Sequence, residues 1–414
     1  MRSQSQGDGL DWPKLFATRA ERMKASEIRE LLKLLDQPDV ISFAGGIPDP
    51  ALFPAKAFSE ALAQSLEGDQ AGLALQYSVS EGYLPLRQWL AERMASLGVP
   101  CTADNIVITT GSQQALDFLG KLFLSPGDTA LVGWPTYLGA LQAFNAYEPR
   151  YDRLNPMGNR LPADFTAAAE AAGGRVKFAY LSGDFANPTG ETVTAEARER
   201  VLDLAEAMDI PVIEDAAYQS LRYEGEEVPP ILALDIARHG GIENTRTLYC
   251  GSFSKTLAPG LRVGWVCGAT PVIQKLVLTK QAADLHSSTL NQMAIHKVAS
   301  ADFPGQVGRI KAAYKSRRDA MLSALSASMP DGVSWTHPDG GMFVWLTLPE
   351  KIDGANLLAE CLKREKVAFV PGKAFFADGS GANTIRLSFS RMAEPVIAEG
   401  VARLGRVVRQ VLAA

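Results

Sequence analysis

Short runs of β-branched and aliphatic residues alternate along this chain with longer segments of helical periodicity, and this alternation constrains the fold more than any other feature. Runs of this kind are typical of strands that are buried on both faces of a parallel sheet. The expected strands are 106–110, 130–132, 176–181, 210–213, 247–250 and 263–267. The expected helices are 58–66, 84–97, 113–123 and 195–208. Strands alternating with helices indicate an α/β fold with a mainly parallel sheet covered on both faces.

The chain beyond about residue 300 has a different pattern. A long basic helix is expected over 306–325, followed by strands at 342–346 and 384–389. We expect this region to form a second, smaller α+β domain that the N-terminal arm joins. The expected division is 1–60 for the arm and first helix, 61–300 for the large domain and 301–414 for the remainder of the small domain.

Composition narrows the function classes. The chain has 414 residues, of which 47% are hydrophobic and 21% charged, as is usual for a globular protein of more than one domain. Its net charge of -5 gives no reason to expect nucleic acid or an anionic membrane as a partner. The 4 cysteines and 4 histidines lack metal-binding spacing, and the polar N-terminus lacks the apolar core of a signal peptide. We therefore expect a cytoplasmic protein with reduced thiols and no metal site.

Lys255 has neighbours with the chemistry of a phosphate site. Ser252 and Ser254 supply hydroxyl donors, and Arg262 supplies a guanidinium fork. A lysine that forms a Schiff base with a cofactor aldehyde needs such neighbours when the cofactor carries a phosphate. A lysine beside serines is, however, more often an exposed charge on a loop, so this segment alone does not decide the function.

Two further polar residues follow expected strands upstream. Asp215 follows the apolar run at 210–213, where its carboxylate could hold the protonated ring nitrogen of pyridoxal phosphate, and Tyr218 could reach the ring's phenolic oxygen. The alternative is that Asp215 caps the next helix. Asn187 follows the strand at 176–181 and could donate to the same oxygen. The alternative is that this Asn-Pro turn only connects two elements, as most such turns do. Ligands of open α/β sheets bind outside these strand ends, so the three signals together predict a pyridoxal phosphate enzyme.

The start of the helix at 113–123 is a second place for the phosphate. Gly111 and Ser112 lead into this helix, whose first backbone N–H groups and positive dipole end favour an anion. The alternative is that Ser112 only caps the helix. Beside the Lys255 loop, phosphate binding is the favoured interpretation.

Arg386 lies within the expected strand at 384–389, where an arginine is costly unless it is paired. Its planar guanidinium matches a carboxylate in bidentate fashion, and every amino-acid substrate offers an α-carboxylate. A structural ion pair is an equally common explanation, and the residues alone leave both open.

Taken in order, the motifs of this chain resemble those of the class I aminotransferases of pyridoxal phosphate fold type I. The resemblance is closest to the branch of 2-aminoadipate and kynurenine/2-aminoadipate aminotransferases, and it extends over nearly the whole chain. It is carried by Tyr77, by 284–292 and by MKASEIREL at 23–31, SFAGGIP at 42–48, EGYLPLR at 81–87, GSQQALD at 111–117, GSFSK at 251–255, PDGGMFVW at 338–345 and NTIRLSF at 383–389.

The resemblance implies a seven-stranded type of sheet and assigns roles to single residues. Ser112 and Gln113 would contact the cofactor phosphate, and Tyr137 would stack on the pyridine ring. Arg386 would bind the substrate α-carboxylate, with Asn187 and Gly46 beside it. The remaining implied cofactor contacts are Lys255, Asp215, Tyr218, Ser252, Ser254 and Arg262. The family also implies a homodimer in which Tyr77 reaches the partner's cofactor phosphate.

The expected preference for acidic amino acids depends on Arg29. Most arginines on such a helix face solvent, but the resemblance places this N-terminal helix over the pocket, where Arg29 would bind an acidic side chain. We therefore expect 2-aminoadipate and glutamate as donors, with aromatic or branched-chain amino acids as further substrates. One departure stands before Asn187, where Asp184 adds a negative charge and Ala186 removes an amide that relatives commonly carry.

The expected reaction is a ping-pong transamination. Lys255 holds the cofactor as a Schiff base and then, once freed, moves the substrate Cα proton as general base. The amino group passes through pyridoxamine phosphate to a 2-oxo acid such as 2-oxoglutarate. A pyridoxal phosphate lyase or decarboxylase could use the same lysine and aspartate. A ligand-sensing regulator of the same fold is the other alternative, and the roughly twenty residues before the first motif are too few for its DNA-binding domain.

Overall fold

The computed structural model describes residues 10–23 and 39–413. Its centre is a seven-stranded sheet with the order β2-β8-β7-β6-β5-β3-β4. Neighbouring strands are parallel except at β8, which is antiparallel to both β2 and β7. The strands are β2 (Ile106–Thr109), β3 (Thr129–Val132), β4 (Arg150–Arg153), β5 (Val176–Leu181), β6 (Val212–Asp215), β7 (Thr247–Ser252) and β8 (Gly264–Cys267). The predicted α/β class with a mainly parallel sheet is confirmed.

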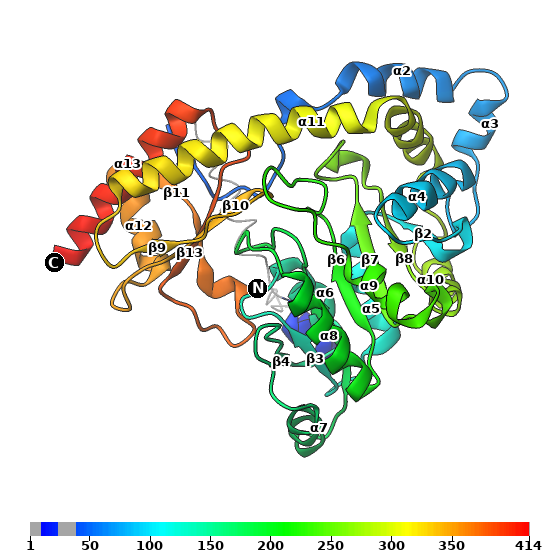
Figure 1. The fold of residues 1–414 in the computed structure, drawn as a ribbon, viewed down its shortest axis with the longest axis horizontal. Helices are drawn as coiled ribbons and strands as arrows, with labels where there is room; N and C mark the ends of the chain where they lie inside the picture. Colours follow the sequence, from blue (N-terminus) through cyan, green and yellow to red (C-terminus); the bar gives the residue numbers. More distant parts are fainter. Residues whose placement is uncertain (1–9, 24–38, 414) are drawn as a thin grey trace, which may run out of the picture.

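Helices cover both faces of this sheet because its strands are apolar on both sides (Figure 1). Val107, Leu248 and Val266 pack on one face against α5 (Ser112–Phe123), α6 (Leu138–Asn145) and α10 (Thr270–Gln281). The residues that alternate with these along the strands point to the opposite face of the sheet and pack against a second layer of helices. That layer contains α2 (Ala55–Ser65), α4 (Leu84–Ser96), α7 (Pro162–Ala171), α8 (Ala195–Met208) and α9 (Ile231–His239). The short helix α3 (Gln70–Leu75) follows α2.

A second group of elements surrounds a four-stranded sheet with the order β12-β13-β10-β9. Its paired strands are antiparallel: β9 (Ser334–Trp335), β10 (Phe343–Thr347), β12 (Val370–Pro371) and β13 (Thr384–Ser388). Helices α12 (Gly354–Glu365) and α13 (Glu394–Ala413) complete it, and one apolar core joins sheet and helices. Strand β1 (Ile41–Ser42) pairs in parallel with β11 (Val367–Ala368), so the N-terminal part of the chain packs with the C-terminal elements.

Helix α11 (Thr289–Ser328) runs across both groups and lies beside α2 and α13 (Figure 1). It consists of two helical segments, because Asp302 leaves the helical conformation and Pro304 follows. The Asp302 carboxylate accepts the backbone N–H of Gly305 at 2.9 Å and so caps the second segment. The predicted helix at 306–325 is this second segment, and the first segment was not predicted.

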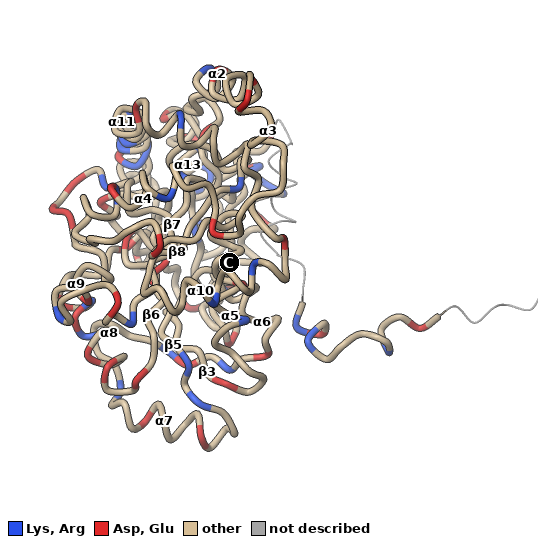
Figure 2. The backbone as a smooth tube through the Cα atoms, turned by 90° about the vertical axis from the view of Figure 1, so that its right-hand side faces the viewer, with Lys and Arg blue, Asp and Glu red and all other residues tan. Residues whose placement is uncertain are grey.

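Residues 10–23 form an arm that contains the short 3-10 helices η1 (Trp12–Leu15) and η2 (Thr18–Arg22). Figure 2 shows the arm leading away from the rest of the chain. Arg22 donates to the carbonyl of Pro149 at 2.7 Å, but neither short helix buries a side chain. None of the helices in the described ranges has both the length and the apolar character that a bilayer span requires.

Candidate active site

A cavity of about 400 Å³ opens where the parallel strands of the central sheet end. Side chains from β6, β7, β13 and the start of α5 line it. The structure brings together here the residues singled out in the sequence, apart from Tyr77 and Arg29. They are Gly46, Ser112, Gln113, Tyr137, Asn187, Asp215, Tyr218, Ser252, Ser254, Lys255, Arg262 and Arg386.

Lys255 follows β7 and reaches across the cavity to the N-terminal segment, where its Nζ donates to the carbonyl of Gly46 at 3.0 Å. Burial lowers the pKa of the Lys255 amine to about 8, and the positive charges of Arg386 and Arg262 act in the same direction. The Asp215 carboxylate opposes this shift. An amine with this pKa is still mostly protonated at pH 7, but its neutral fraction is far larger than that of an ordinary lysine, and the neutral form is the one that acts as nucleophile or proton acceptor.

Asp215 ends β6 and is buried beneath the cavity. Its Oδ2 accepts the Tyr180 hydroxyl at 2.8 Å, whereas no described group meets hydrogen-bond geometry with its Oδ1. Burial raises the pKa of Asp215, and the Tyr180 hydroxyl, the Ala217 amide and the Lys255 charge each oppose that rise. A buried carboxylate oxygen without a partner is costly unless a cationic or N–H group meets it. This oxygen therefore marks a place for a protonated ring nitrogen.

The start of α5 and the Lys255 loop form one concave surface. Gly111 has a φ of +78° in the left-handed region, and a Cβ on it would lie 2.4 Å from Nη2 of Arg262. Gly264 is equally constrained, because a Cβ there would lie 2.7 Å from the backbone N of Ser112. The two glycines thus let the Arg262 fork and the helix N-terminus meet at one point, which suits a phosphate group.

Gln113 holds a neighbouring aromatic ring in place. Its Nε2 donates to the carbonyl of Gly139 at 2.6 Å, and its Oε1 accepts the Tyr137 hydroxyl at 3.4 Å. Its side-chain amide is thus engaged with α6 and Tyr137, which leaves its backbone N–H in the first turn of α5 to face an anion. Burial raises the pKa of Tyr137 to about 12, and the Asp215 charge adds to this effect. Tyr137 is therefore neutral and presents an aromatic ring to the cavity.

Arg386 is 1% exposed, yet no carboxylate of the described residues lies within 4.0 Å of it. Its Nη1 donates to Oδ1 of Asn187 at 2.7 Å, its Nη2 donates to the carbonyl of Ala44 at 3.0 Å, and its Nε has no partner. The guanidinium lies 4.3 Å from the centroid of the Phe343 ring. Burial lowers the pKa of Arg386 to about 10, and the neighbouring Tyr218 and Tyr137 oppose this shift. The site is therefore built to receive an anion.

Gly46 keeps room beside this guanidinium. A Cβ on Gly46 would lie 3.0 Å from the Phe343 ring and 3.6 Å from Nη2 of Arg386. The Tyr218 ring packs edge-to-face on the same Phe343 ring, with 5.7 Å between the centroids. Burial raises the pKa of Tyr218, and Asn187 opposes that rise through a hydrogen bond. Asn187 thus connects Arg386 with Tyr218.

Tyr77 lies apart from this cavity, on the segment after α3. Its side chain is 79% exposed, and its ring centroid is 6.0 Å from that of His286. The predicted contact of Tyr77 with the cofactor phosphate of a partner subunit stays a prediction. Arg29 lies outside the described residues.

The sequence did not single out several groups in or under this cavity. Tyr180 positions Asp215, and Ile47, Gln142 and Ser182 add to the lining. Tyr180 belongs to an apolar run, in which a tyrosine at an alternating position is the only available signal.

The departure before Asn187 has a structural explanation. Asp184 is buried and does not line the cavity; its Oδ1 lies 2.9 Å from Nη2 of Arg198 and 3.3 Å from Nη2 of Arg222. Ala186 lines a second cavity of about 390 Å³, which shares Tyr137, Ser182 and Asn187 with the first. The extra negative charge is thus neutralised within the protein rather than presented to a substrate.

This geometry agrees with comparisons to known proteins. The family model for aminotransferases of class I and II matches residues 38–404, and the chain belongs to this family. It is 44% identical over 405 residues to the 2-aminoadipate transaminase of Thermus thermophilus. This match covers 98% of this chain and 99% of the relative. It is also 44% identical over 407 residues to aromatic-amino-acid aminotransferase 1 of Thermococcus litoralis. This match covers 97% of this chain and 95% of that relative.

Among solved structures, the chain is similar to LysN, an α-aminoadipate aminotransferase of Thermus thermophilus complexed with N-(5'-phosphopyridoxyl)-L-leucine. The TM-score is 0.86 at 41% identity, over 98% of this chain and 100% of the other. The expected fold type I and the expected transaminase class are confirmed.

The protein is therefore a pyridoxal phosphate-dependent transaminase. The residues present fit this cofactor, because the buried Oδ1 of Asp215, the Lys255 amine and the surface around Gly111 face one cavity. When bound, pyridoxal phosphate supplies an electron-withdrawing ring that stabilises negative charge at the substrate Cα.

Proposed function

We propose that this enzyme transfers the amino group of 2-aminoadipate and glutamate, and of aromatic or branched-chain amino acids, to a 2-oxo acid such as 2-oxoglutarate. The observation that carries this proposal is the buried Arg386, which has no acid partner among the described residues and shares a cavity with Lys255. The names of the relatives, 2-aminoadipate transaminase and aromatic-amino-acid aminotransferase, support the same range of donors.

In this proposal each residue has one task. Arg386 binds the substrate α-carboxylate in bidentate fashion and so orients the Cα–H bond. The Lys255 amine takes the Cα proton and returns it one step later. Asp215, held by Tyr180, keeps a proton on the cofactor ring nitrogen, and Asn187 and Tyr218 face the ring's oxygen. Ser112, Gln113, Ser252, Ser254 and Arg262 hold the phosphate, and Tyr137 stacks on the ring.

The test is a half-reaction with purified holoenzyme and single amino acids, followed by absorbance of the cofactor and by release of 2-oxo acid. We expect both signals with 2-aminoadipate and glutamate, and turnover only when an acceptor is added. Release of ammonia or carbon dioxide without an acceptor would instead identify a lyase or decarboxylase. Lys255→Ala should abolish both signals, and activity at the wild-type level in this variant would refute the assignment.

We propose that Arg29 binds the distal carboxylate of acidic donors. Arg29→Ala should then lower kcat/KM for 2-aminoadipate and glutamate by about tenfold or more, because a hydrogen-bonded charge pair is lost. Turnover of leucine and phenylalanine should stay at the wild-type level. Unchanged turnover of both acidic donors would exclude this role.

We propose a homodimer in which Tyr77 reaches the partner's cofactor phosphate. Two exposed apolar segments support the homodimer. One is the α3 segment with Leu75 and Tyr77. The other is the arm, whose apolar side chains, each at least 59% exposed, are Leu10, Trp12, Leu15, Phe16 and Met23. Sedimentation should give twice the chain mass, and Tyr77→Phe should weaken cofactor binding in the dimer. A monomer with full activity would refute it.

We further propose a cytoplasmic location, which the free thiols of Cys101, Cys250, Cys267 and Cys361 support. The domain division at residues 60 and 300 is also a proposal, supported by the pairing of β1 with β11.

A further inference from the structure

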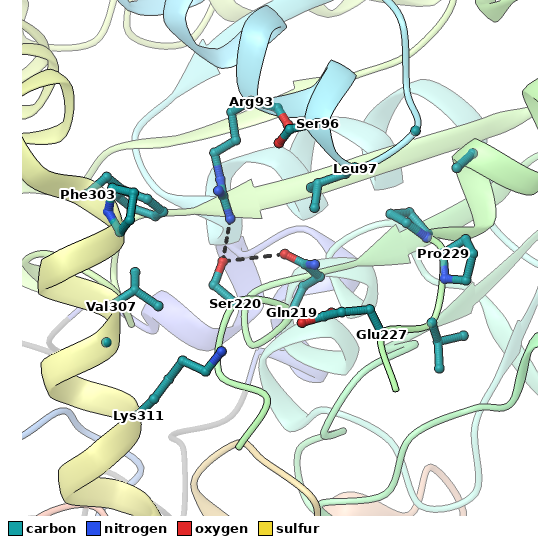
Figure 3. A pocket seen from close by; sticks show the side chains of 16 residues that line it. Arg93, Ser96, Leu97, Gln219, Ser220, Glu227, Pro229, Phe303, Val307 and Lys311 are labelled. Carbon is teal, nitrogen blue, oxygen red and sulfur yellow. Dashed lines mark hydrogen bonds between the residues drawn. The ribbon is translucent and has the colours of Figure 1, made fainter. Parts of the chain in front are cut away.

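A third cavity, of about 800 Å³, lies beside the segment that follows β6. Helix α4, the second segment of α11, the turn at 219–220 and the loop at 227–230 line it (Figure 3). It shares no lining residue with the active-site cavity. Its volume falls within the range of roughly 300–1,000 Å³ that is usual for small-molecule sites.

Two cations reach into this cavity from different helices. Arg93 comes from α4 and Lys311 from α11, and both point inward (Figure 3). Within residues 10–23 and 39–413, neither has a carboxylate within 4.0 Å. Arg93 Nη2 donates to the Ser220 hydroxyl at 2.6 Å, and its guanidinium lies 4.5 Å from the centroid of the Phe303 ring. Burial lowers the pKa of Arg93, and the Glu227 charge opposes this shift from beyond contact distance.

Among the described residues that line the cavity, Glu227 is the one acid, and it also lies near Arg222. The Glu227 side chain is 68% exposed, and its Oε2 lies 3.8 Å from Nε of Arg222. Arg93, Lys311 and Glu227 together leave an excess of one positive charge. A ligand with a single negative charge would balance it.

The rest of the wall is mainly apolar. It consists of Leu97, Val228, Pro229, Pro230, Ala233, Phe303, Pro304 and Val307, with Ser96 and Gln219 as further polar groups. A wall of this kind binds a hydrocarbon body, while the Arg93 guanidinium offers N–H donors to a planar carboxylate. The Ser220 hydroxyl accepts from Arg93 and donates to Oε1 of Gln219 at 3.4 Å, so it holds this guanidinium in place. We propose that this cavity is a regulatory site for a small monocarboxylate with an apolar body.

Two connections link the cavity with the active site. Gln219 and Ser220 directly follow Tyr218, and the backbone N–H of Leu221 donates to the Tyr218 carbonyl at 2.8 Å, so the turn is short and fixed. Phe303 packs edge-to-face on Phe253 at 6.3 Å between ring centroids, and Phe253 lies between Ser252 and Ser254. Phe303 also adjoins Asp302, where the two segments of α11 meet. A bound carboxylate therefore acts on both the Tyr218 turn and the Lys255 loop.

Binding is tested with 4-phenylbutyrate by calorimetry on enzyme whose active site is filled with N-(5'-phosphopyridoxyl)-L-leucine, so that Arg386 is not available to the probe. We expect saturable binding, a Kd raised about tenfold in Arg93→Gln, and a Kd raised about threefold in Lys311→Met, because a flexible ammonium lacks the bidentate geometry of a guanidinium. Arg364→Gln, an exposed helical arginine away from the cavity, should bind like wild type. 4-Phenylbutylamine and inorganic phosphate should not compete.

Regulation is tested with the cofactor-loaded enzyme. Saturating 4-phenylbutyrate should change kcat/KM by about fivefold in wild type and Arg364→Gln, and should not change it in Arg93→Gln. The proposal is overturned if the probe does not bind, if Arg93→Gln and Lys311→Met both bind it like wild type, or if its binding leaves kcat/KM unchanged. Lys311→Met changes a half-buried side chain on a different helix, and it keeps the test informative if Arg93→Gln does not fold.

Discussion

Arg198 and Arg386 are both almost fully buried, and their surroundings differ in one respect. Arg198, on α8, lies 2.9 Å from Oδ1 of Asp184 and donates to the carbonyls of Gly183, Val193 and Pro229. Arg386, on β13, donates only to an amide and a backbone carbonyl among the described residues. The positive charge of Arg198 is neutralised by Asp184 within the protein. The positive charge of Arg386 needs an anion that binds from outside. Burial of an arginine therefore indicates function only when its acid partner is missing.

The largest expected effect concerns Arg198 and tests the structural half of this comparison. Arg198→Met should lower the free energy of unfolding by about 3–5 kcal/mol, because Asp184 and Glu214 would stay buried with one cation fewer. The kcat/KM of the protein that remains folded should change little, since Arg198 does not line the active-site cavity. Urea unfolding and kinetics below the transition measure both. A stable variant with lost activity would place Arg198 in the catalytic machinery.

The converse effect is expected at Arg386. Arg386→Gln should lower kcat/KM by about 10²-fold, because the substrate carboxylate loses a buried charged partner. Its free energy of unfolding should stay within about 1 kcal/mol of wild type or rise, since a desolvated cation without an acid partner is removed.

Arg391→Gln is the matched control, because Arg391 is exposed and lies five residues further along the chain. It should leave both quantities unchanged. If Arg386→Gln were as unstable as Arg198→Met and kept its kcat/KM, the distinction between the two arginines would fail.

The same comparison shows how far the sequence could go. Lys255, Asp215 and Asn187 were predictable as one site because each follows an apolar strand, and the ends of parallel strands meet at one edge. The pairing of Arg198 with Asp184 was not, because nothing in the amphipathic pattern of α8 shows that this arginine is buried. Tyr180 was missed for a similar reason, since its hydroxyl meets Asp215 only in the folded sheet.

The missed elements of the fold have local causes. Strand β4, with the sequence RYDR, is an edge strand with no buried residue, so it lacks the apolar run that predicts a strand. The first segment of α11 was missed because Pro304 and Gly305 interrupt the helical pattern. Apolar periodicity therefore predicted the centre of the sheet, and these two elements were missed because one is polar and the other is interrupted.

The smallest expected effect concerns Glu214, which lies 3.8 Å from Arg198 and accepts the backbone N–H groups of Ile231 and Leu232. Burial raises the pKa of Glu214 from 4.5 to about 7, and these partners oppose the rise. Between these two pH values the folded state keeps a proton that the unfolded state has lost. The free energy of unfolding should therefore fall as pH rises through this window, by on the order of 2 kcal/mol relative to Glu214→Gln. Urea unfolding at several pH values measures the difference, with exposed Glu60→Gln as the control that should keep the wild-type slope. Parallel curves for wild type and Glu214→Gln would show that Arg198 keeps Glu214 ionised throughout, and the cluster would then be paired as completely at pH 5 as at pH 7.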